Sequence, residues 1–146
     1  MQTARPLPLL CPSAQPDMEG ASAFGVVGGT GDVPRVAWIE RPIPVTADLL
    51  ALTGAVPAAR IFRFSAPCQQ SACCHFDGKD CTLAARLVQL LPAVVGQLPP
   101  CQIRQDCRWF VQEGKSACAR CPQIITDSAN PTKDLSLAAM LPRARL

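Results

Sequence analysis

The sequence predicts a small α+β protein, irregular and rich in proline and glycine, with a metal-stabilised, cysteine-rich C-terminal half that contains two short helices. Some short stretches alternate like strands, others have helical periodicity, and eight of the 9 cysteines fall between residues 68 and 121. The 146 residues include 15 prolines and 9 glycines, which leaves a modest apolar core. We therefore expect bound metal to supply much of the stability of residues 68–121.

The N-terminal segment, residues 1–32, mixes Pro, Gly, Ser, Gln and Ala without a sustained period. Such a segment buries too little apolar surface to offset the entropy lost on ordering, so a flexible arm is expected. It contains Cys11, which is distant in sequence from every other thiol and is for this reason expected to be an unperturbed, rapidly alkylated cysteine. Prolines interrupt the short apolar run before Cys11, so we read no secretory signal.

Residues 33–126 are predicted to form one cysteine-rich metal-binding domain, and residues 127–146 a tail. The domain begins with a strand–helix–strand unit at 35–64. The cysteines follow in two groups, at 68–81 and 101–121.

Within the first unit, the segment 35–40 reads as a strand that stops before the prolines that follow it. Thr46 is a suitable N-cap for a short helix at 47–53. The segment 59–64 alternates imperfectly and is expected to be a half-exposed strand.

Two helices are predicted around the cysteines. Residues 82–91 have apolar side chains on one face of an amphipathic helix. Residues 102–113 also have their apolar side chains on one face of a helix, with Cys107 on that inner face. Gly114 is a natural stop for this helix.

Charge and hydropathy exclude two classes of partner. The net charge is +3 and its basic residues are dispersed, unlike the clustered basic surface of a nucleic-acid-binding protein. No apolar stretch approaches the roughly 18 residues that a membrane helix needs. Because we read no secretory signal, we expect a cytoplasmic protein whose thiols are reduced, where grouped cysteines more often bind metal than form disulfides.

The first cysteine group has the pattern Cys68-x4-Cys73-Cys74-His75-x5-Cys81. Its expected metal ligands are Cys68, Cys73, His75 and Cys81. Cys74 is either a substitute ligand or a bystander, because adjacent cysteines rarely bind one metal. The lone histidine is as consistent with a structural role as with ligation.

The second group has the pattern Cys101-x5-Cys107-x10-Cys118-x2-Cys121-Pro122. All four thiols are expected to bind a metal centre. Cys121-Pro122 resembles the Cys-Pro ending of the bacterial ferredoxin cluster motif, and iron–sulfur clusters of the 4Fe-4S type tolerate irregular ligand spacing. Structural zinc usually takes two short Cys knuckles, so zinc remains the alternative metal.

These patterns predict a small metalloprotein with two cysteine-based sites, most consistent with iron–sulfur, that acts in electron transfer or as a redox-responsive accessory protein. Its expected partner is a protein, either a redox enzyme or an assembly. The alternative is a structural zinc module that binds another protein without redox activity. Independent catalysis is not expected, because the only histidine, His75, lies inside a cysteine group and no framed carboxylate pair is present.

Overall fold

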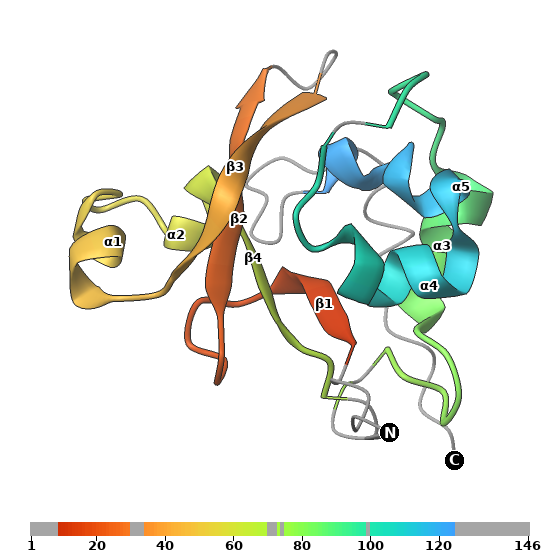
Figure 1. Ribbon diagram of the computed structural model, residues 1–146, viewed down its shortest axis with the longest axis horizontal. Coiled ribbons are helices and arrows are strands. Elements are labelled where there is room, and N and C mark those ends of the chain that lie inside the picture. Colours follow the sequence, from red (N-terminus) through yellow and green to blue (C-terminus); the bar gives the residue numbers. More distant parts are fainter. Residues whose placement is uncertain (1–8, 30–33, 70–72, 74, 99, 125–146) are drawn as a thin grey trace, which may run out of the picture.

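A four-stranded antiparallel sheet and several short helices make up the computed structural model (Figure 1). The structure describes residues 9–29, 34–69, 73, 75–98 and 100–124. This architecture confirms the small α+β class. The expected tail at 127–146 lies outside the described residues, and no described helix has the length and apolar character needed to cross a membrane.

The sheet has the strand order β1-β4-β2-β3, and all neighbouring strands are antiparallel. Strands β2 and β3 form a hairpin, while β4 arrives from later in the sequence and separates β1 from β2. The strands are β1 Leu10–Ala14, β2 Ser22–Gly29, β3 Pro34–Pro44 and β4 Phe62–Pro67.

The expectation of a flexible arm over residues 1–32 is wrong for residues 10–14 and 22–29, which form β1 and β2. Strand β2 packs through small residues and therefore shows no alternation of large apolar side chains. Ala23 is fully buried. Gly25 lies so close to Val36 that a Cβ at this position would come within 2.6 Å of the Val36 Cγ1. Long-range pairing thus stabilises these strands. Residues 1–8 and 30–32 lie outside the described part of the chain.

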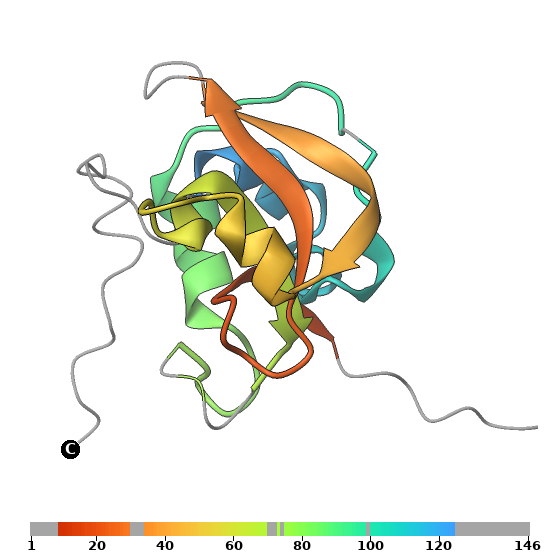
Figure 2. The same ribbon diagram turned by 90° about the vertical axis from the view of Figure 1, so that its left-hand side faces the viewer.

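Helices cover both faces of the sheet (Figures 1 and 2). Helices α1 and α2 lie on one side, and the cysteine-bounded helices α3, α4 and α5 lie on the other. The described helices are α1 Ala47–Ala51, α2 Ala58–Ile61, α3 Thr82–Leu90, α4 Arg108–Glu113 and α5 Lys115–Cys118, together with the 3-10 turns η2 Arg104–Asp106 and η3 Cys121–Gln123.

Several local predictions hold. Thr46 caps α1 by accepting a hydrogen bond from the Leu49 amide at 3.2 Å. Helix α3 covers nearly the whole predicted 82–91 segment. Gly114 ends α4 with a φ of 68°, a left-handed conformation that glycine adopts without strain.

Other boundaries differ from the prediction. The strand predicted at 35–40 is β3, and it continues through Pro42 to Pro44. Proline is tolerated there because β3 is at the edge of the sheet, where a missing amide proton breaks no hydrogen bond of the ladder. The predicted strand at 59–64 is instead helix α2 followed by β4. The predicted 102–113 helix is interrupted at Cys107, which has extended backbone angles of −75° and 125°.

Two apolar clusters form the core. One lies between the sheet and α1 and α2, and contains Phe62 and Phe64 of β4. The other is built around Trp109 of α4, which is 2% exposed, and includes Leu87 of α3 together with Cys81, Cys107 and Cys121. Successive β4 side chains face opposite ways, so Arg63 points away from the phenylalanines towards the second cluster.

Replacing Leu87 with alanine should destabilise the protein by about 2–5 kcal/mol, because Leu87 is fully buried among large neighbours. Leu90 in the same helix is 39% exposed and provides a matched control, for which a change of about 0.5 kcal/mol or less is expected. Urea denaturation of the two variants measures the difference. Equal losses would show that α3 does not pack through the Leu87 face.

Candidate functional site

The four thiols of the second cysteine group surround one cavity, which we call the second cavity. It has about 380 Å³ of unfilled space, including the part open to solvent. Its cysteines are Cys101, Cys107, Cys118 and Cys121, the set expected from the sequence. Apolar walls come from the sheet and the helices: the stacked pair Phe24 and Trp38, with ring centroids 5.7 Å apart, and Trp109.

Short helices position these thiols by beginning or ending at them. Cys107 is the N-cap of α4, Cys118 is the last residue of α5, and Cys121 begins η3. Burial raises the pKa of Cys107 from 9.0 to about 12, although the amides of Phe110 and Trp109 at the start of α4 act in the opposite direction. The free Cys107 thiol is therefore neutral at physiological pH.

The remaining cysteines surround a first cavity, with about 370 Å³ of unfilled space including its open part. Its four thiols are Cys11, Cys68, Cys73 and Cys81, and its walls include Phe76, Arg108 and Trp109. The three cysteine ligands expected in the first group, Cys68, Cys73 and Cys81, are therefore brought together here, but the fourth residue beside them is Cys11 and not His75.

Cys11 reaches this cavity because β1 pairs with β4. Cys11 is opposite Ala66, and the Cys68 amide donates to the Leu9 carbonyl at 2.7 Å, so the chain enters the first cysteine group directly beside β1. Burial raises the pKa of Cys11 from 9.0 to about 12. The expectation that Cys11 is an unperturbed thiol in a flexible arm is therefore wrong.

Cys81 is held at the start of α3 by Gln112 of α4. The Gln112 side chain accepts from the Cys81 amide at 2.7 Å and donates to its carbonyl at 2.9 Å. The preceding turn is stabilised by Asp77, whose Oδ1 accepts from the amides of Lys79 and Asp80 at 2.9 and 2.8 Å. The two hydrogen bonds of Gln112 thus connect α4, the helix that contains Trp109, to the backbone of Cys81 in the first cavity.

His75 has other partners. Arg86 lies 3.0 Å from His75 Nδ1, and the His75 carbonyl accepts from both the amide and the hydroxyl of Thr82 at 2.7 Å. Burial, followed by the nearby Arg86 charge, lowers the pKa of His75. His75 does not line either four-thiol cavity, and Cys74 lies outside the described residues.

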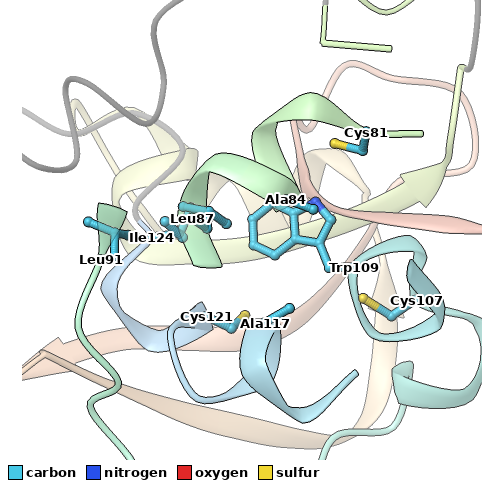
Figure 3. Packing of buried hydrophobic residues seen from close by; sticks show 9 residues of the cluster. All are labelled: Cys81, Ala84, Leu87, Leu91, Cys107, Trp109, Ala117, Cys121 and Ile124. Atoms are coloured by element: carbon cyan, nitrogen blue, oxygen red, sulfur yellow. The ribbon is translucent and has the colours of Figure 1, made fainter. Parts of the chain in front are cut away.

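Trp109 is the wall that the two cavities share. Figure 3 shows its indole between Cys81 on one side and Cys107 and Cys121 on the other. Its Nε1–H has no acceptor at hydrogen-bonding geometry among the described atoms, yet it lies near enough to Cys81 to help lower the pKa of that thiol against the larger effect of burial.

Arg63 is a residue of the site that the sequence analysis did not single out. Its side chain is fully buried and donates to the Cys121 carbonyl at 2.7 Å, the Pro12 carbonyl at 2.8 Å and the Cys121 Sγ at 3.3 Å. The guanidinium also lies over the Phe24 ring, 5.4 Å from its centroid. Nothing in the sequence around Arg63 indicates that its side chain faces inward, so its burial is identified only from the fold.

No group of three or more Cys, His, Asp or Glu side chains is gathered closely enough to hold a single ion within the described ranges. The thiols instead stand around the cavity walls. All eight cysteines that the structure describes are free thiols, and every one of them lines one of the two cavities.

Metal binding to the metal-free protein should strengthen as pH rises. The raised pKa values of Cys11 and Cys107 keep these thiols protonated, so each must lose its proton before its sulfur can bind. For each proton that is released on binding, the metal affinity should rise by about tenfold for every unit that the pH increases, as long as the pH stays below the pKa of the thiol. Cobalt(II) titrations at pH 6.5 and 8.5 with a competing chelator test this expectation, and equal affinities at the two pH values would contradict it.

Comparison with known proteins finds no matching family model, no matching curated protein and no matching solved structure.

Proposed function

We propose that this chain is a small cytoplasmic iron–sulfur protein, with one cluster in each four-thiol cavity, that acts in electron transfer or as a redox-responsive accessory protein. The observation that carries the proposal is the division of the eight described cysteines into two sets of four, each around its own cavity. Four cysteine thiolates are the usual ligand set of an iron–sulfur cluster.

The distribution of the thiols favours a cluster over a single ion. A tetrahedral zinc ion brings four sulfurs to about 2.3 Å from one point. A cluster has several irons, which thiolates can reach from different directions, and a ligand set spread around a cavity suits that demand.

The charges at the second cavity also fit a thiolate-bound centre. Arg63 is a permanent cation with no exposed surface, and within the described part of the chain its charge faces no carboxylate. Burying an unpaired charge is costly, and the Cys121 sulfur, 3.3 Å away, is the group in contact that can become an anion. A metal centre with four thiolates supplies that negative charge.

An iron–sulfur cluster supplies reversible one-electron transfer. The chain's own residues have the remaining tasks: the eight cysteines bind, Phe24, Trp38 and Trp109 exclude water, and Gln112 orients Cys81. Since this leaves no group assigned to substrate chemistry, the proposed partner is a protein, either a redox enzyme or an assembly.

The test is to purify the full chain without oxygen and to record its visible spectrum and its iron, acid-labile sulfide and zinc contents. Brown protein with broad sulfur-to-iron absorption and equal iron and sulfide is the expected result. Colourless protein with stoichiometric zinc would overturn the proposal and support the structural zinc module that binds another protein.

A further inference from the structure

The two cavities differ in the positive charge beside their thiols, because a fully buried arginine contacts a cysteine of the second cavity only. The inference drawn from this difference rests on the proposed iron–sulfur function. We propose that the second centre has the higher reduction potential and accepts electrons from the first, with Arg63 as the residue that sets this direction. Three features of the chain carry the argument: the isolation of Arg63 from water, the position of the other arginines and the wall that the cavities share.

Arg63 places a buried positive charge beside the second cavity, against the Cys121 sulfur. The guanidinium is fully buried on β4, contacts the Cys121 sulfur at 3.3 Å and is held in place by two carbonyls and by Phe24. Arginine does not lose its proton in proteins, so the charge is permanent. A fixed buried cation beside a redox centre stabilises the reduced, more negative state and thereby raises the potential.

A second arginine adds to this charge. Arg104 of η2 lines the second cavity and interacts with Cys118. The first cavity is lined by one arginine, Arg108, which is only half-buried and lies over the Phe76 ring, 5.5 Å from its centroid. Arg104 and Arg108 are both half-buried, so water screens their charges alike, and it is the fully buried Arg63 that makes the second centre the more strongly stabilised when reduced.

The shared wall gives the electron a short route. Trp109 lines both cavities, and Figure 3 places its ring between Cys81 and the pair Cys107 and Cys121. In the proposed step one electron leaves the first centre, which is oxidised, and enters the second, which is reduced. No bond forms or breaks and no proton moves, and a reduced flavoprotein or iron–sulfur protein, which is itself oxidised, supplies the next electron to the first centre.

The experiment is a redox titration of the anaerobically purified full chain, followed by visible absorption and electron paramagnetic resonance. Two one-electron waves are expected. Cys11→Ser should remove the lower one, and Cys101→Ser the higher one. Iron and sulfide contents are measured first, so a wild-type protein without iron defeats the proposed function before the potentials are compared.

Arginine variants then test the cause. Arg63→Gln should shift only the higher wave to lower potential, while Arg63→Lys, which keeps the positive charge, should restore most of the shift. Arg104→Gln, at a partly exposed position, should shift the same wave in the same direction and keeps the test decisive if Arg63→Gln does not fold. Arg41→Gln, at an exposed position on β3, is the matched control and should shift neither wave.

Two outcomes would overturn the inference while leaving the proposed function intact. One is that Cys101→Ser removes the lower wave, which reverses the direction of transfer. The other is that both arginine-to-glutamine variants of the second cavity keep the wild-type potentials.

Discussion

Replacing Cys11 with serine should remove about half of the bound iron and sulfide, and leave the second cavity loaded. Cys11 is half-buried on β1 and lines the first cavity with Cys68, Cys73 and Cys81. A serine hydroxyl is a poor substitute for a thiolate, so the first centre loses one of its four ligands. Iron and sulfide assays on anaerobically purified variants measure the loss.

His75→Gln is the matched control, because His75 is adjacent to the same cysteines in sequence but bonds with Arg86 and Thr82 in the fold. This variant should keep its full iron content. Cys101→Ser should lose the other half. If His75→Gln loses half of the iron and Cys11→Ser loses none, the original ligand set of Cys68, Cys73, His75 and Cys81 is the correct one.

Removing the metal should lower the stability of the protein by a large margin. A ligand present at about 1,000 times its Kd stabilises the folded state by roughly 4 kcal/mol, and the proposed function gives each cavity one such ligand. Metal loss also leaves the buried charge of Arg63 without the negative charge of a thiolate-bound centre. The thermal midpoint of the metal-free protein should therefore be well below that of the metal-bound protein.

Amide hydrogen exchange can locate this effect. Faster exchange after metal removal is expected in α3, α4 and α5, whose ends hold the cysteines, and less change is expected in the β2–β3 hairpin, which is stabilised by its own pairing. A thermal midpoint and exchange pattern that are unchanged by chelation would show that neither cavity holds a structurally important metal.

Local patterns predicted the helical half well. The apolar period of α3, the Thr46 cap and the Gly114 stop are each encoded within a few residues. The grouping of Cys101, Cys107, Cys118 and Cys121 follows from short helices that begin or end at cysteines. The Cys107 interruption was missed, because helical periodicity does not register a single extended residue.

The first cavity was predicted only in part because its fourth thiol comes from a distant strand. The β1–β4 pairing joins Cys11 to the neighbourhood of Cys68, and spacing along the chain contains no trace of that contact. Strand β2 was missed for a related reason, since its alanine and glycine residues fit between two neighbours without an apolar period. Arg63 belongs to a segment that was predicted to be a half-exposed strand, whereas β4 lies inside the sheet and the Arg63 side chain is fully buried.

Anomalous diffraction from crystals of the anaerobically purified protein, measured above and below the iron absorption edge, tests the central claim most directly. The account predicts two iron peaks, one among Cys11, Cys68, Cys73 and Cys81 and the other among Cys101, Cys107, Cys118 and Cys121. Peaks at the zinc edge alone, a single iron peak bound by cysteines from both sets, or no metal peak in either cavity would contradict it.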